Sequence, residues 1–79
     1  MNDRPIWTGD LNDYCTAEWH GLELCAERMS YGFWWWAVYD LHDEIASSND
    51  TDLMPASGAE ARKCAEDAAR KYLAGKERP

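Results

Sequence analysis

Positive charge is scarce in most of this chain. Residues 1–56 contain eleven acidic side chains and only two basic ones, Arg4 and Arg28, which gives that segment a net charge of −9. Residues 57–79 hold six bases and four acids, so the 79-residue chain carries −7 in total. A protein that holds nucleic acid by its phosphates needs a basic surface. The charge balance therefore argues against direct nucleic-acid binding as the main function.

Long apolar runs are also missing. No stretch approaches the ~20 residues of a membrane-spanning helix, and the polar start, residues 1–5, lacks the pattern of a signal peptide. With 46% hydrophobic residues and 13% aromatic ones, the chain is nevertheless too apolar for a disordered acidic tail. We expect one folded cytoplasmic domain, residues 1–79, without membrane contact.

The chain has few of the motifs that carry catalysis or bind metals. It lacks a glycine-rich phosphate loop, a nucleophile elbow and a paired-histidine zinc motif. Its three cysteines form an odd set without C-x-x-C spacing, which argues against a disulfide framework and a structural zinc site. Cys25 lies between Glu23 and Glu27, whose charges raise a thiol pKa and make it a poor nucleophile. The sequence predicts no enzyme activity, no cofactor and no metal site.

The clearest predicted element is a C-terminal helix over residues 57–74. Ser57 and Glu60 have the spacing of a capping box. An apolar stripe follows at helical spacing, formed by Ala61, Cys64, Ala65, Ala68 and Tyr72. Glu66 and Arg70 are expected to pair on the solvent side. Gly75 is typical of a helix end, and residues 75–79 are expected to form a frayed tail.

The residues before this helix predict a β-meander over 13–48, preceded by an N-terminal segment, 1–12. Residues 22–29 and 34–39 alternate in the manner of strands around a turn at 30–32. Shorter strands are expected at 13–19, through a turn at His20-Gly21, and at 44–47, after a solvated turn at 40–43. A short helix capped by Asp10 is the alternative for 10–19. The expected fold is α+β: an antiparallel three- to four-stranded meander packed by one C-terminal helix.

Strand alternation then divides the aromatic residues between two faces. Trp34, Trp36 and Val38 are expected to meet the helix, together with Leu22 and Leu24. Trp35 and Tyr39 fall on the other face, where no helix is available. Either the N-terminal segment folds over them or they form a binding or dimer surface ringed by acids. The candidate partner-binding residues are Asp10, Asp13, Glu23, Glu27, Trp35, Tyr39, Asp40, Asp43 and Glu44.

Two segments carry a resemblance to a known class of proteins. The strand Trp34-Trp35-Trp36-Ala37-Val38 followed by Ala59-Glu60-Ala61-Arg62-Lys63-Cys64-Ala65-Glu66 resembles small phage- and prophage-encoded proteins, over roughly residues 17–74. Within that group the chain looks like the acidic anti-CRISPR inhibitors. The resemblance implies a bacterial host cytoplasm and a protein partner, namely a Cas effector subunit or a crRNA-guided surveillance complex. The class has no shared functional motif, so no residue role is carried over.

Three functions are compatible with these features. The first is an inhibitor that acts as a DNA mimic, pairing its acids with the basic groove of its partner. The second is a homo-oligomeric structural or accessory phage protein that uses the aromatic sheet face as a dimer interface. The third is a regulator that binds DNA through Arg62 and Lys63 on the helix, which the charge of residues 1–56 disfavours.

Overall fold

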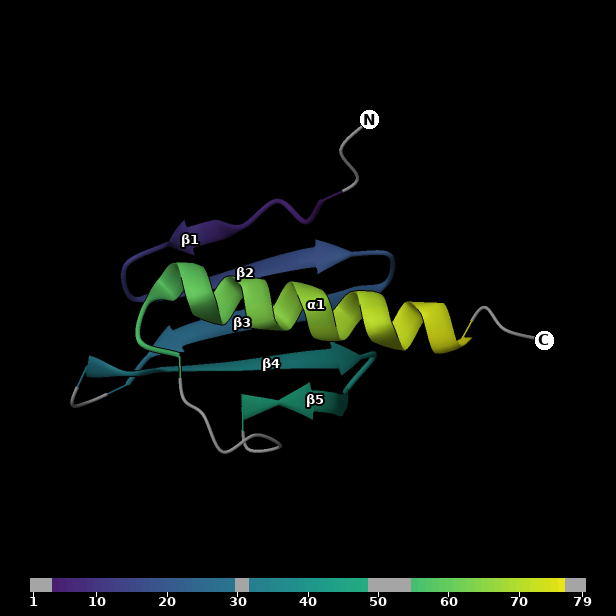
Figure 1. The fold of residues 1–79 in the computed structure, drawn as a ribbon. Helices are drawn as coiled ribbons and strands as arrows, with labels where there is room; N and C mark the ends of the chain where they lie inside the picture. Colours follow the sequence, from purple (N-terminus) through teal and green to yellow (C-terminus); the bar gives the residue numbers. More distant parts are fainter. Residues whose placement is uncertain (1–3, 30–31, 49–54, 77–79) are drawn as a thin grey trace.

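The computed structural model describes residues 4–29, 32–48 and 55–76. These residues form one antiparallel sheet and one helix: β1 (Thr8–Asp10), β2 (Tyr14–Trp19), β3 (Leu22–Arg28), β4 (Trp34–Asp40), β5 (Asp43–Ser47) and α1 (Gly58–Lys76). Each strand pairs with the next along the chain, and α1 lies across one face of the sheet (Figure 1). The predicted α+β fold is confirmed, with five strands instead of three to four.

The additional strand, β1, lies in the segment for which no structure was predicted. Its three residues, Thr8-Gly9-Asp10, are all exposed, and none of them is a large apolar residue that would mark a buried face. Backbone pairing with β2 defines the strand, with Thr8 opposite Thr16 and Asp10 opposite Tyr14. The alternative of a helix after Asp10 is wrong. The Asp10 carboxylate instead accepts a hydrogen bond from the Asn12 backbone at 2.9 Å, within the turn that leads into β2.

The hairpin turns fix how the strands align. His20 and Gly21 join β2 to β3 with φ values of 52° and 81°, the backbone of a tight two-residue hairpin, as expected from the sequence. Leu41 begins the turn between β4 and β5 at a φ of 60°, and its side chain is 81% exposed. The expected turn at 30–32 falls largely outside the described residues, as does most of the expected tail.

The start of α1 follows the predicted capping box. The Ser57 hydroxyl accepts a hydrogen bond from the Glu60 backbone N–H at 3.2 Å. The Glu60 carboxylate accepts one from the Ala56 N–H at 3.0 Å, one residue before the cap. The helix runs over Gly58–Lys76 instead of 57–74, so Gly75 lies in its last turn and not beyond its end.

The core lies between α1 and the sheet. Alternation directs Trp34, Trp36 and Val38 toward the helix, as predicted, and all three are buried. The central row of the helix is Ala61, Ala65 and Ala69, each fully buried. The predicted stripe correctly included Ala61 and Ala65 but omitted Ala69. Its other members lie at the flank of this row and are half-buried: Cys64, Ala68 and Tyr72. Small helix residues bring the backbone of α1 close to the sheet, and the tryptophans supply the volume.

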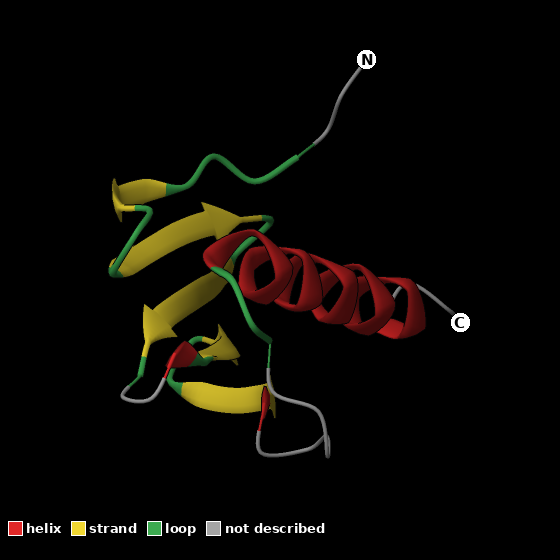
Figure 2. Cartoon of the chain, turned by 60° about the vertical axis from the view of Figure 1, so that its left-hand side comes forward, coloured by secondary structure: helices red, strands yellow, loops and turns green. Residues whose placement is uncertain are grey.

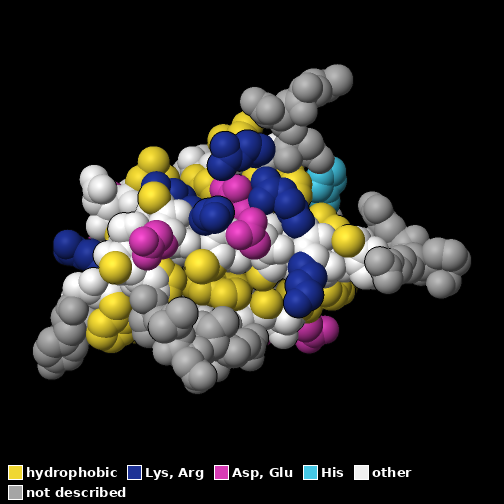
Figure 3. All heavy atoms as spheres, in the orientation of Figure 1, with side chains coloured by type: hydrophobic (Ala, Val, Ile, Leu, Met, Phe, Trp, Pro, Cys, Tyr) yellow, Lys and Arg dark blue, Asp and Glu magenta, His cyan; other side chains and the backbone are white. Residues whose placement is uncertain are grey.

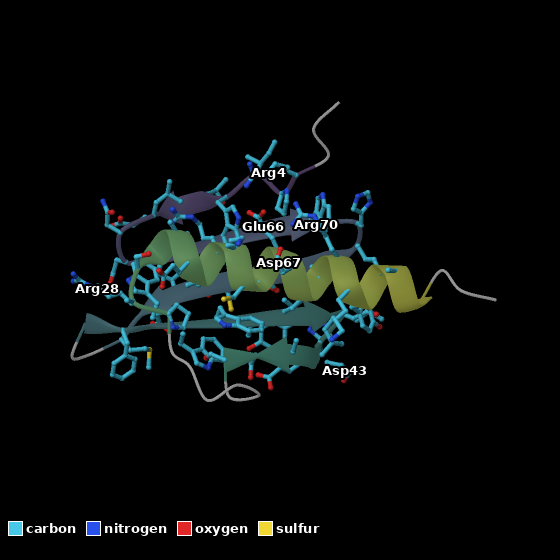
Figure 4. All side chains as sticks on the ribbon, in the orientation of Figure 1. Arg4, Arg28, Asp43, Glu66, Asp67 and Arg70 are labelled. Atoms are coloured by element: carbon cyan, nitrogen blue, oxygen red, sulfur yellow. The ribbon has the colours of Figure 1, made fainter. Side chains whose placement is uncertain are left out.

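Glu66 differs most from its predicted position on the wet side of the helix. Its side chain is buried, and its carboxylate accepts a hydrogen bond from Trp7 Nε1 at 2.8 Å. Arg4 and Arg70 approach the same carboxylate, at 3.4 and 3.6 Å; Figure 4 shows the three charged residues together. These contacts attach the N-terminal segment to the helix side of the sheet. Burial of the charge is compatible with folding because the Trp7 indole N–H and two arginine cations surround it.

Two glycines of α1 give opposite predictions for the same substitution. A Cβ on Gly58 would lie 2.9 Å from both the Leu11 carbonyl oxygen and Trp34 Cη2. A Cβ on Gly75 would meet nothing within 4 Å. We expect Gly58→Ala to lower the free energy of unfolding by about 1–3 kcal/mol through overpacking. Gly75→Ala should raise it, by up to about 0.5–1 kcal/mol.

Urea denaturation of both variants measures these changes. A gain in stability for Gly58→Ala would contradict the close approach of the helix start to the sheet.

Candidate functional site

The candidate site is the face of the sheet opposite α1, called the open face below. Figure 2 shows α1 on one side of the sheet, and no helix of the described chain lies on the other. Antiparallel pairing places directly opposed residues on the same face. The open face therefore consists of three cross-strand rows: Asp10, Tyr14, Glu27 and Trp35; Thr8, Thr16, Cys25, Ala37 and Ser47; and Glu18, Glu23, Tyr39 and Glu44.

Aromatic rings and carboxylates are direct cross-strand neighbours in both outer rows. In the first, Glu27 lies between Tyr14 and Trp35 on the neighbouring strands. In the third, the order is reversed, and Tyr39 lies between Glu23 and Glu44. Directly opposed side chains in an antiparallel pair have Cβ atoms about 4.5–5.5 Å apart. Each of these carboxylates is thus a direct neighbour of at least one aromatic ring.

The middle row has small side chains and is closed to solvent at its centre. Cys25 is 5% exposed and Ala37 is fully buried. Because α1 lies on the opposite side, their burial does not come from the helix. Large side chains of the outer rows reach such diagonal neighbours across a sheet. We therefore describe the open face as a platform, with aromatic rings and carboxylates standing on either side of a closed centre.

Electrostatic coupling joins the two outer rows into one patch. Burial raises the pKa of the Tyr14 hydroxyl, and the neighbouring Cys25, Glu23 and Glu27 raise it further. Burial likewise raises the pKa of Tyr39, to which Cys25 and Glu44 add. Glu23 of the third row thus raises the pKa of the tyrosines in both outer rows.

All charged residues in the three rows are acidic: Asp10, Glu18, Glu23, Glu27 and Glu44. Glu18 and Glu23 stand directly opposite each other on β2 and β3. Like charges in such a position destabilise a sheet. A positively charged group bound to this face would relieve the repulsion.

The structure brings together six of the nine predicted site residues. Five lie in the rows of β3, β4 and β5, and the sixth, Asp10, extends the first row at the sheet edge: Asp10, Glu23, Glu27, Trp35, Tyr39 and Glu44. Trp35 and Tyr39 are half-buried, and Glu23 is exposed. In the described part of the N-terminal segment, residues 4–12, Trp7 lies against Glu66 on the helix side and does not cover these two rings.

Three predicted residues lie elsewhere. Asp13 belongs to the turn before β2 and approaches Arg28 Nε at 3.9 Å. Asp40 lies on the helix side, where its carboxylate accepts a hydrogen bond from the Tyr72 hydroxyl at 2.6 Å. Asp43 is its register partner at the end of the sheet; Figure 4 places Arg28 and Asp43 at opposite ends of the molecule.

The sequence prediction omitted two members of the open face, Tyr14 and Glu18. Tyr14 is 47% exposed and Glu18 is exposed. Both belong to β2, which lies within residues 10–19, where the sequence left a short helix open as the alternative to a strand. Alternation within 13–19 would have identified them once the strand was accepted, since Cys15 and Ala17 are the buried residues between them.

The surface over α1 has a different character. Figure 3 shows basic side chains there, intermixed with acidic ones. Arg70 approaches Glu66 at 3.6 Å and Asp67 at 3.5 Å, and Arg62 donates a hydrogen bond to the Leu11 carbonyl at 3.0 Å. These contacts are those of a salt-bridged helix surface.

The arrangement of the potential metal ligands and of the Cys25 thiol is as follows in the described residues. Within residues 4–29, 32–48 and 55–76, no three potential metal ligands of the His, Cys, Asp or Glu type come together. His42 is exposed in its turn. Burial raises the pKa of the Cys25 thiol to about 11, and Glu23 and Glu27 contribute in the same direction. The predicted direction of that shift is confirmed, and at neutral pH the thiol is protonated and a poor nucleophile.

The helix of the described chain is not long and apolar enough to cross a membrane. Comparison with protein-family models, with curated proteins and with solved structures gives no match.

The raised pKa of Cys25 predicts a loss of stability in alkali. The unfolded thiol ionises near its ordinary value of 9.0, and the folded one only near 11. Between these values the unfolded state releases a proton that the folded state keeps, so the free energy of unfolding falls as pH rises. For the Cys25→Ala variant, the free energy of unfolding measured by urea denaturation should fall less steeply over this pH range. Identical slopes for the two proteins would contradict burial of the thiol.

Proposed function

We propose that this chain is a non-catalytic binding protein whose open face docks on a basic surface of a partner protein. The partner surface is one that otherwise holds nucleic-acid phosphates, so the chain acts as a stoichiometric inhibitor and a DNA mimic. The observation that carries this proposal is the composition of the open face: five acids, no base and three large aromatic residues in three adjacent rows.

The charge distribution favours such a partner. Residues 1–56 carry a net charge of −9. The open-face carboxylates contribute to this charge, and they lie on the side of the sheet opposite the basic residues of α1. A concentrated negative surface accelerates association with a positive one. Because surface charges are screened beyond about 8 Å at physiological ionic strength, the binding should weaken as salt is added.

The aromatic residues add apolar contact area, which charged groups alone do not provide. Tyr14, Trp35 and Tyr39 are partly exposed on a rigid sheet, so they offer contact area with little loss of side-chain freedom on binding. A surface that served only to keep the protein soluble would not need large rings among its acids. Rings beside carboxylates suit an interface in which a basic protein surface is desolvated.

The partner to test first is a Cas effector subunit or a crRNA-guided surveillance complex. This choice rests on the resemblance of the strand and helix segments to the acidic anti-CRISPR inhibitors. In this form of the proposal, the chain occupies the basic groove meant for target DNA and is made in a bacterial host cell.

A homo-oligomeric phage protein is the alternative. A symmetric dimer through the open face would set this acidic patch against the same acidic patch of a second copy. The resulting repulsion disfavours that arrangement, so the proposal expects a monomer by light scattering at high micromolar concentration. A stable dimer that dissociates on Trp35→Ser would favour the alternative.

The test compares two triple charge reversals with the same change in net charge. The first, Glu23→Lys/Glu27→Lys/Glu44→Lys, alters the open face. The matched control, Asp13→Lys/Asp43→Lys/Asp67→Lys, alters exposed acids that lie outside it. Circular dichroism establishes that both fold. The readout is fluorescence anisotropy of labelled target DNA bound to purified surveillance complexes of several CRISPR types.

Wild-type chain and the control variant should displace the DNA from at least one complex, and the open-face variant should lose at least about 100-fold in potency. Inhibition that survives the open-face reversal would contradict the proposed site. Absence of inhibition throughout the panel would contradict the CRISPR partner.

A further inference from the structure

We infer that the open face selects arginine over lysine in its partner, an inference that rests on the proposed function and specifies its chemistry. The proposed function requires only positive charge. The arrangement of rings and carboxylates on this face is more specific than charge, because each outer row places an aromatic ring directly beside carboxylates.

The first row offers one such arrangement. Glu27 is the direct cross-strand neighbour of both Tyr14 and Trp35. A cation that pairs with this carboxylate is therefore held beside an aromatic ring on either side. Tyr14 is 47% exposed and Trp35 is half-buried, so both rings are accessible in part.

The third row offers the complementary arrangement. Tyr39 lies between Glu23 and Glu44, and a cation over its ring has a carboxylate on each side. Glu23 and Glu27 are four residues apart on β3. At about 3.4 Å per residue their separation is about 13–14 Å, which places two cation-binding positions on one platform.

Arginine fits these positions better than lysine for chemical reasons. The guanidinium group is planar, pairs with a carboxylate through two parallel hydrogen bonds and stacks on aromatic faces. It is also less strongly hydrated than an ammonium group, so it is more easily transferred onto a partly buried platform. The ammonium group of lysine is a compact, strongly hydrated charge that gains less from a ring.

On the helix side of the sheet, an arginine of this chain lies beside both an aromatic ring and carboxylates. The Arg70 guanidinium carbon lies 5.4 Å from the centroid of the Trp19 ring. The same group approaches the Glu66 and Asp67 carboxylates at 3.6 and 3.5 Å. An arginine of this molecule thus combines a tryptophan ring with carboxylates. On the open face the rings and carboxylates belong to the sheet, and the arginine must come from the partner.

Two peptides that differ only in their basic residues test the inference. Each is a flexible glycine- and serine-based chain with two cations four residues apart, a spacing that spans the two rows when the peptide is extended. One peptide has arginines and the other lysines. Binding to the full chain is measured by backbone amide NMR titration at the same low ionic strength.

The arginine peptide should bind about tenfold more tightly, with the largest shifts on β3 and β4. Trp35→Leu and Tyr14→Leu should each reduce the preference while leaving lysine binding nearly unchanged. Tyr14 is the more exposed of the two, so its variant remains informative if Trp35→Leu unfolds. Glu23→Gln/Glu27→Gln should weaken both peptides.

Equal affinities for the two peptides would overturn the inference and leave the proposed function intact. An arginine preference that survives loss of the aromatic rings would also overturn it. Failure of both peptides to bind would contradict the inference and the proposed function together.

Discussion

One constraint governs this molecule: a single helix covers only one face of a five-stranded sheet. On the covered face, small helix residues pack against large sheet residues. Ala61, Ala65 and Ala69 bring the helix axis close to the sheet. Trp34 and Trp36 fill the space beneath it. The burial of these large rings stabilises the fold. The opposite face then has to be compatible with solvent, and its composition is free to serve binding.

The pattern on the open face depends on the register of the strands. A shift of one residue would turn Trp35 toward the helix and Trp36 toward solvent. The left-handed backbone at His20 and Gly21 makes the short turn that aligns β2 with β3. The arrangement of rings and carboxylates is therefore a consequence of turn geometry as much as of the residues themselves, and the proposed chemistry of binding follows from local backbone structure.

Much of this arrangement is predictable from short-range pattern. Alternation in 22–29 and 34–39 places the tryptophans on the correct faces, and Ser57 with Glu60 locates the helix start. The remainder requires tertiary information. β1 has no apolar pattern and is defined by its pairing with β2. Glu66 has the spacing of a solvent-exposed residue, and its burial depends on Trp7, 59 residues away in the chain. A local pattern carries no signal for such contacts.

The central claim is that the consecutive tryptophans of β4 face opposite environments. The most direct measurement is relaxation of the indole proton NMR signals by a soluble, uncharged paramagnetic probe, with each signal assigned through a single Trp→Phe variant. We expect strong relaxation for Trp35 and weak relaxation for Trp34 and Trp36, which are 6% and 5% exposed. Equal protection of all three, or weaker relaxation of Trp35 than of its neighbours, would contradict it.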